Sequence, residues 1–410
     1  MTSRRSVLAG LAGLATLGPV RAASGSGSDI PPFHRGIGVS HAMGWAEVRS
    51  DGSYGDAPFA APRFRFDAGQ RQAIRKAGFD FVRLAVDVGP FLALQGTARD
   101  QLDDLLIGTV RTLLDADLGA IVDLHPSAMN PAYRPAALTA GLDAPAFRAV
   151  LALQQRLARL LEALAESRAG SGFPRLAFEL MNEPEVPQAA WQPMLEATYR
   201  AARTGSARLP LVLGGGSMNS AAALTATDTR PFAGDARLIY TYHDYAPWQF
   251  THQGVRGSPA HALDAIPYPA PPSADAMVAA TRQRITGLGL NGAALDEADK
   301  AERTLARYAG FDRSSLETRF RQVNAWRLTK GLPAHAVLLG EFGVHRTAYM
   351  DTPKGAAARE RWLRDMRELA EAQGFAWAAW TYTGTGGFAL AESETGPGFD
   401  AATLRALGLR

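Results

Sequence analysis

The chain contains no cysteine, and its charges of the two signs almost balance, with 43 basic and 40 acidic residues. Without disulfides the fold must rely on a hydrophobic core, which 410 residues can supply. The formal net charge of +3 is matched by Arg4, Arg5 and Arg21, so the rest of the chain is close to neutral. We therefore expect no nucleic-acid partner and no membrane partner for the mature protein.

Long apolar runs are also missing, and the run from Val7 to Leu17 is too short to span a bilayer. Two arginines precede this run, and small residues follow it up to Ala23. The pattern predicts a twin-arginine-type signal peptide over residues 1–23 and export to the periplasm or the medium. A mobile cytosolic N-terminus is the alternative. Residues 24–30 are rich in Gly and Ser and predict a flexible linker.

The remaining residues, 31–410, contain short β-rich runs that recur along the whole segment. Several are almost continuously apolar, which is typical of parallel strands buried on both faces. We predict eight strands, at Arg35–His41, Phe79–Asp87, Gly119–His125, Leu176–Asn182, Leu209–Gly214, Leu238–His243, Val337–Phe342 and Phe375–Trp380.

Amphipathic helical patterns separate these runs, most clearly at Gln101–Leu118 and Ala146–Ser167. Alternating strands and helices predict an α/β protein, and eight repeats favour a single closed (β/α)₈ TIM barrel. No glycine-rich phosphate fingerprint follows the first strand, which disfavours an open dinucleotide-binding sheet. The stretch from Phe250 to Leu316 is too long for an ordinary loop and predicts an insertion after strand 6 that lines the top of the barrel.

Polar and aromatic residues gather at the C-terminal ends of the predicted strands, where barrel enzymes place their active sites. The set comprises Arg83, His125, Asn182, Glu183, His243, Tyr245, Glu341 and Trp380. Two carboxyl groups in opposite protonation states are what the cleavage of a glycosidic bond requires.

Individual roles follow from the chemistry of these side chains. Arg83 is expected to pair with Glu341 and to keep it an oriented anion. Repulsion by that anion is expected to raise the pKa of Glu183, so that it holds a proton. Asn182 can donate to a sugar hydroxyl, Tyr245 can steady the nucleophile, and Trp380 offers a flat face for a sugar ring.

The motifs Asn182-Glu183-Pro184 and Glu341-Phe342-Gly343 resemble those of glycoside hydrolase family 5, the cellulase family of retaining barrels. The resemblance covers residues 31–410 as one catalytic domain. It implies Glu183 as acid/base, Glu341 as nucleophile, and the other six residues named above as the surrounding site. The first strand departs from the family pattern, because Arg35-Gly36-Ile37-Gly38 replaces the usual Arg-Gly-Ile-Asn.

The resemblance predicts a secreted, monomeric enzyme that cleaves a polysaccharide or oligosaccharide with retention, most simply an endo-β-1,4-glucanase. An exo-acting β-glucosidase or β-1,3-glucanase, a β-mannanase and an exopolysaccharide-trimming glycosidase are the alternatives. An inactive polysaccharide-binding barrel is a further one. The chain has no His-Glu-x-x-His motif and no Gly-x-Ser-x-Gly motif, so we expect no metal, no cofactor and no serine nucleophile.

Several residues admit a second, purely structural interpretation. Trp45 and Trp248 fall in loops at strand ends and are predicted substrate platforms, but loop tryptophans also pack loops against the core. His125 and His243 could be core histidines. We expect Asp123 to be structural, and Asp244 to point outward toward solvent or a helix.

Overall fold

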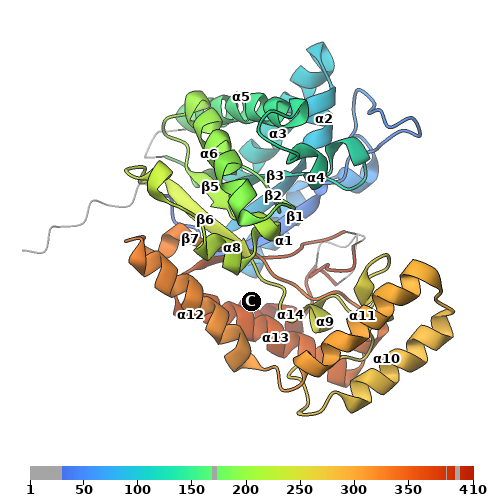
Figure 1. The fold of residues 1–410 in the computed structure, drawn as a ribbon. Coiled ribbons are helices and arrows are strands. Elements are labelled where there is room, and N and C mark those ends of the chain that lie inside the picture. Colours follow the sequence, from blue (N-terminus) through green and yellow to red (C-terminus); the bar gives the residue numbers. More distant parts are fainter. Residues whose placement is uncertain (1–29, 169–172, 385, 393–397) are drawn as a thin grey trace, which may run out of the picture.

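The computed structural model describes residues 30–168, 173–384, 386–392 and 398–410. The predicted signal at 1–23 and nearly all of the predicted linker at 24–30 lie outside this part of the chain. Eight parallel strands close into a barrel in the order β1 to β8, with β1 paired to β8 (Figure 1). The predicted single (β/α)₈ barrel is confirmed.

All eight predicted strands are present, and the bounds of the third and sixth are as predicted. Apart from β1, every strand is buried along its whole length. This is expected of a barrel, because helices cover the outer face of the sheet and the inner face packs against itself. The strands are β1 (Arg35–Met43), β2 (Phe81–Asp87), β3 (Gly119–His125), β4 (Leu176–Glu179), β5 (Leu211–Gly214), β6 (Leu238–His243), β7 (Val337–Glu341) and β8 (Ala376–Ala379).

Helices lie outside the barrel and bury their apolar faces against it (Figure 1). They are α1 (Ala68–Ala77), α2 (Val88–Ala93), α3 (Gly96–Asp115), α4 (Pro135–Leu138), α5 (Pro145–Ser167), α6 (Gln188–Gly205), α7 (Gly216–Asn219), α8 (Ala221–Thr225), α9 (Trp248–Thr251), α10 (Asp275–Leu288), α11 (Gly292–Tyr308), α12 (Arg313–Thr329), α13 (Pro353–Ala372) and α14 (Ala401–Ala406). Short 3₁₀ turns connect some of them, including η4 (Pro259–Ala262).

The barrel interior changes character along its axis. Its N-terminal half is filled by a separate apolar cluster that includes Phe81, Ile121 and Leu338. Two residues further along β2 and β3, the side chains of the same strand face are Arg83 and Asp123. The charged groups at the top of the barrel therefore rest on a dry apolar floor.

The predicted insertion after strand 6 is present, and between β6 and α12 it consists of α9, η4, α10 and α11. Helices α10 and α11 pair with each other and pack on η4 around Ala262, Ile285 and Ala298, at the lower right of Figure 1. In the described part of the chain, no helix combines the length and the apolar character needed to cross a membrane.

Candidate active site

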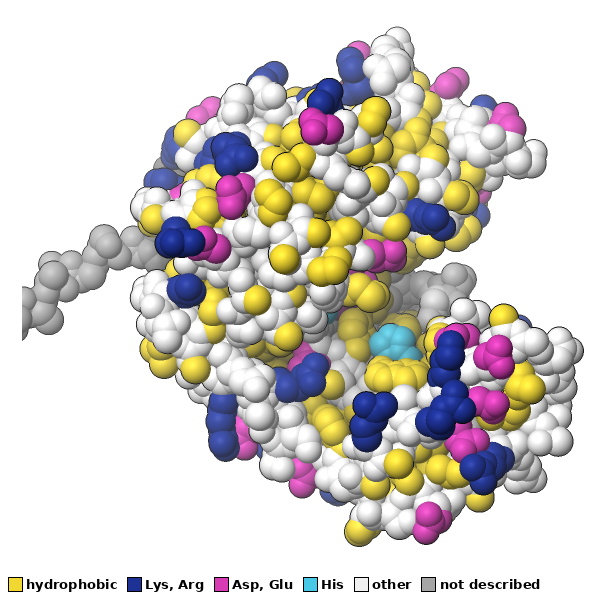
Figure 2. Space-filling view, in the orientation of Figure 1, with side chains coloured by type: hydrophobic (Ala, Val, Ile, Leu, Met, Phe, Trp, Pro, Cys, Tyr) yellow, Lys and Arg dark blue, Asp and Glu magenta, His cyan; other side chains and the backbone are white. Residues whose placement is uncertain are grey.

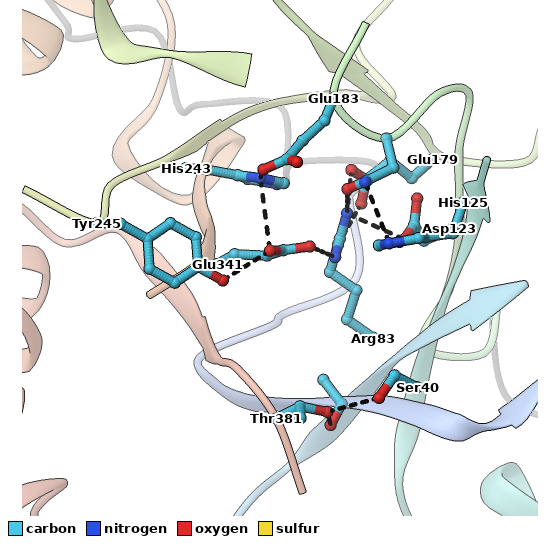
Figure 3. A network of polar contacts seen from close by, with 12 residues as sticks. Ser40, Arg83, Asp123, His125, Glu179, Glu183, His243, Tyr245, Glu341 and Thr381 are labelled. Carbon is cyan, nitrogen blue, oxygen red and sulfur yellow. Dashed lines mark hydrogen bonds and ion pairs between the residues drawn. The ribbon is translucent and has the colours of Figure 1, made fainter. Parts of the chain in front are cut away.

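Arg83 at the centre of β2 joins the carboxylates at the top of the barrel (Figure 3). Its side chain is fully buried, and Nη1 donates to Oε1 of Glu341 at 2.6 Å. Nε and Nη2 donate to the two oxygens of Glu179 at 2.7 and 2.8 Å, and Nη2 also donates to Oδ1 of Asn182 at 2.9 Å. The predicted Arg83–Glu341 pair is therefore present.

Glu179 on β4 is the partner that the sequence interpretation missed. Burial raises the pKa of Glu179, whereas Arg83 lowers it. Burial alone would lower the pKa of Arg83, but Asp123, Glu179 and Glu341 together hold it well above its usual value. One guanidinium is thus shared by three carboxyl groups, which fixes its orientation toward Glu341. The signal was available, because Glu179 interrupts an apolar strand and shares the side of Glu183 by two-residue alternation.

A second chain of hydrogen bonds orients Asn182. Nδ1 of His125 lies 2.7 Å from Oδ2 of Asp123, and its Nε2 lies 3.3 Å from Nδ2 of Asn182. Burial lowers the pKa of His125 and raises that of Asp123 to about 7. A neutral His125 with its proton on Nδ1 can accept from Asn182, so the amide keeps its nitrogen toward the imidazole. Asp123 therefore orients the ring of His125, and the predicted roles of both residues stay predictions.

Glu183 and Glu341 face each other across His243 (Figure 3). Nδ1 of His243 lies 2.8 Å from Oε1 of Glu183 and 3.7 Å from Oε2 of Glu341. The hydroxyl of Tyr245 donates to Oε2 of Glu341 at 2.8 Å. Glu341 is therefore held on both oxygens, on one by Arg83 and on the other by Tyr245.

Burial has the largest effect on the protonation of Glu183 and of His243. It raises the pKa of Glu183, with smaller opposing effects from His125 and Arg83. The expectation that repulsion by Glu341 would be the main cause is wrong, because loss of solvent contributes more. Burial also lowers the pKa of His243 to about 4, so its ring is neutral near pH 7.

A metal ion would find its ligands in the same place. Among the described residues, Glu183, His243 and Glu341 bring potential ligand atoms within 4.8 Å of one another. The expectation of a site without metal stays a prediction.

A strained turn after β5 braces the loop that carries Glu183. Ser217, Met218 and Asn219 all have left-handed backbones, with φ of 47°, 58° and 52°, at a cost of about 1–2 kcal/mol each. The amides of Ser217 and Met218 donate to the carbonyls of Val186 and Pro184 at 2.7 and 3.0 Å. The strain is thus located directly beside the loop of the predicted acid/base.

Trp380, at the end of β8, forms an aromatic group with His125 and Trp45. Its ring stacks on His125 with centroids 5.5 Å apart and planes 3° apart, and Trp45 meets His125 edge-on at 5.4 Å. The departure in the first strand has a reason here, because a Cβ on Gly38 would lie 2.6 Å from the Trp380 ring. Glycine therefore allows the indole to lie against β1.

Two cavities flank the carboxylate pair. The larger, which we call the β1–β8 cavity, has a volume of about 860 Å³ and is lined by residues that include His41, Trp45, Phe64, Trp380 and Phe388. The smaller, the β6–α11 cavity, has about 380 Å³ and is lined by residues that include His243, Tyr245, Trp248, Arg307 and Arg319.

The two predicted platform tryptophans thus lie on opposite flanks. Trp45 is 36% exposed over the larger cavity, and the half-buried Trp248 lines the smaller one. Two other loop aromatics, Tyr54 and Phe250, are buried and pack the loops. Asp244 faces a helix, because Nε of Arg319 on α12 donates to its Oδ2 at 2.8 Å.

The closed barrel and the paired carboxylates at its C-terminal end are those of a glycoside hydrolase barrel. The chain belongs to the cellulase family, glycosyl hydrolase family 5, whose sequence pattern matches residues 67–386. The resemblance stated from the motifs is confirmed.

Two curated relatives match part of the chain. It is 26% identical over 214 residues to endoglucanase 3 of Fibrobacter succinogenes, which is 51% of this chain and 30% of that protein. It is 27% identical over 187 residues to cellodextrinase A of Ruminococcus flavefaciens, which is 44% of this chain and 52% of that protein. The chain thus matches about half or less of the length of these relatives.

Among solved structures, the cellulose synthase subunit Z of Clostridioides difficile is similar with a TM-score of 0.60 at 19% identity. The match covers 92% of this chain and 99% of that one. At this identity the likeness concerns the fold alone.

Proposed function

We propose that this protein is an exported endo-β-1,4-glucanase that hydrolyses its substrate with net retention. The observation that carries the proposal is the spacing of the carboxylates, since oxygens of Glu183 and Glu341 lie within 4.8 Å of each other. Retaining enzymes hold their carboxyl groups about 5–5.5 Å apart, whereas inverting enzymes need about 6.5–9.5 Å to admit a water. The geometry favours direct attack by one carboxylate.

In the first step Glu341 attacks the anomeric carbon and forms a glycosyl ester while the bond to the leaving sugar breaks. Glu183 transfers its proton to the leaving oxygen, for which its raised pKa suits it. Arg83 and Tyr245 fix the attacking carboxylate in position. Asn182 is placed to donate to the sugar hydroxyl beside the reacting carbon.

In the second step Glu183, now a carboxylate, takes a proton from a water molecule. The water oxygen bonds to the anomeric carbon, and the ester bond to Glu341 breaks. His243 stays neutral and within 2.8 Å of Glu183, so it can hold the carboxyl group in place in both of its states.

Endo action is supported by the cavities on both flanks of the pair, which leave room for sugar units on either side of the cleaved bond. A β-1,4-glucan substrate is supported by endoglucanase 3 and cellodextrinase A among the relatives. Export by the twin-arginine route is supported by Arg4-Arg5 before a short apolar run.

The test is reducing-end release from carboxymethylcellulose, mixed-linkage glucan, mannan, xylan and laminarin, with Glu341→Gln as control. We expect release from the two β-1,4-linked glucans and none from the variant. Proton NMR of the first product should show the β anomer before it equilibrates. An α anomer, or full activity in Glu341→Gln, would disprove the mechanism. Release from mannan alone would show that the substrate is a mannan and not a β-1,4-glucan.

A further inference from the structure

The β6–α11 cavity has a chemical character that hydrolysis of a neutral glucan does not require. It lies beside His243 and Tyr245, and helices α9, α11 and α12 supply its other walls. Its apolar surface comes from Trp248, Tyr308 and Phe311. Basic side chains lie along the lower wall of the hollow in Figure 2.

The charges of this cavity do not balance. Asp244 is its acidic residue and is 2% exposed, and its carboxylate is already paired with Arg319 at 2.8 Å. Arg307, in the last turn of α11, is exposed and has no hydrogen-bond or ion-pair partner among the described residues. Since His243 is neutral, the cavity carries a surplus positive charge.

The other flank shows that this surplus is specific to one side. Arg63 and Arg65 line the β1–β8 cavity, but Arg63 pairs with Glu47 at 3.0 Å and Arg65 with Asp67 at 3.2 Å. The charges of the larger cavity are therefore compensated within the protein. We assign the leaving sugars to the β6–α11 cavity, because His243, which holds the proposed proton donor Glu183 at 2.8 Å, lines it. Among the described residues that line the two cavities, this flank alone presents a guanidinium without an ion-pair partner.

We propose that the β6–α11 cavity binds a carboxylate on a sugar of the leaving segment, so that the preferred substrate is a β-glucan with acidic units. A guanidinium matches a carboxylate with two parallel hydrogen bonds, and Arg319 keeps its terminal nitrogens for a second contact. Trp248 provides an apolar face for the ring that carries the acid. The inference rests on the proposed function for the position of the cleaved bond.

The test measures binding, so that it does not depend on turnover. In a Glu341→Gln background, titration calorimetry compares a cello-oligosaccharide with two isomers that carry one glucuronate, near the reducing or the non-reducing end. We expect the reducing-side isomer to bind roughly threefold to tenfold more tightly than the neutral sugar. The preference should shrink at about 1 M salt, where the screening length is near 3 Å.

Arg307→Glu should reverse this preference, and Arg307→Lys should keep part of it. Arg111→Ala removes an exposed arginine of α3 that lines neither cavity, and it should leave the binding preference unchanged. Equal binding of all three sugars, or a preference that survives Arg307→Glu, would overturn the proposal while the glucanase assignment stood. Failure of the wild type on every glucan in the panel would instead refute that assignment, and the binding comparison would still decide the question of the acidic ligand.

Discussion

The two flanks of the carboxylate pair are built differently. Loops that follow β1 and β8 line the β1–β8 cavity, with the stacked ring of Trp380 and charges that are paired within the protein. The β6–α11 cavity takes three of its walls from α9, α11 and α12, and it includes Arg307, which has no partner in the described part of the chain.

The difference shows which part of the chain can set which property. The flank made by strand-end loops is tied to the catalytic residues themselves, because Trp380 stacks on His125. The flank made by the insertion carries its free charge on Arg307 of α11, which makes none of the hydrogen bonds that hold Glu183 and Glu341, so its charge can vary without disturbing the chemistry. Substrates that occupy one or both flanks can separate the two contributions.

The largest effect is expected from Glu183→Gln, which removes the proposed proton donor between the flanks. The value of kcat/KM on cellohexaose should fall by about 10²–10⁴. A dinitrophenyl cellobioside fills only one flank, and its leaving group, dinitrophenolate, departs without being protonated. The value of kcat/KM for this substrate should therefore change far less. The basic limb of the pH profile on cellohexaose, which we attribute to the raised pKa of Glu183, should also disappear. An equal loss on both substrates would contradict the acid role.

Gly216→Ala tests the brace after β5. A Cβ at this position would lie 2.5 Å from the carbonyl of Val186, so the loop that carries Glu183 must shift. We expect kcat/KM on cellohexaose to fall by about ten- to hundredfold, with the aryl cellobioside largely spared. Gly108→Ala, where nothing lies within 4 Å of the added Cβ, is the matched control. Loss on both substrates would show general misfolding rather than displaced acid catalysis.

Trp45→Ala and Trp248→Ala compare the two platforms directly. Loss of Trp45 should raise KM by roughly tenfold for cellohexaose and for the aryl cellobioside alike, because both use the β1–β8 cavity. Loss of Trp248 should raise KM for cellohexaose alone. Steady-state kinetics on the two substrates decides this, and identical patterns in the two variants would show that the flanks are not separate.

The smallest effect concerns how the Trp45 loop is anchored. Asp87, at the end of β2, accepts from the amide of Ala46 at 3.1 Å, and burial raises its pKa to about 7. A raised carboxyl pKa stabilises the fold at low pH, and the contribution is lost as pH rises through about 7. In Asp87→Asn, the fall in unfolding free energy from about pH 5 to pH 8 should be smaller by on the order of 2 kcal/mol. Urea titrations at the two pH values measure this difference in unfolding free energy. Asp143→Asn, at an exposed residue, should show the same pH dependence as the wild type.

The sequence predicted the barrel because buried parallel strands are apolar runs whose ends carry the polar groups. Convergence of those ends was enough to bring Arg83, Glu183 and Glu341 together. It did not reveal Glu179, because the predicted fourth strand ran on to Asn182 and placed Glu179 in its interior, whereas β4 ends at Glu179. The left-handed turn at 217–219 could not be predicted, because the sequence Ser-Met-Asn does not indicate three successive residues with positive φ. Trp45 and Trp248 both follow predicted strands in loops, so their sequence contexts are alike. The fold shows that they line different cavities.

The closure of β1 against β8 also determines when the protein becomes an enzyme. The ion pair between Arg83 and Glu341 joins residues 258 positions apart, and Trp380 arrives only with the last strand. Contacts so distant in sequence slow folding, and this one cannot form before both strands have been synthesised. A chain still being synthesised therefore has no complete site, and activity begins only once the ring of strands is closed.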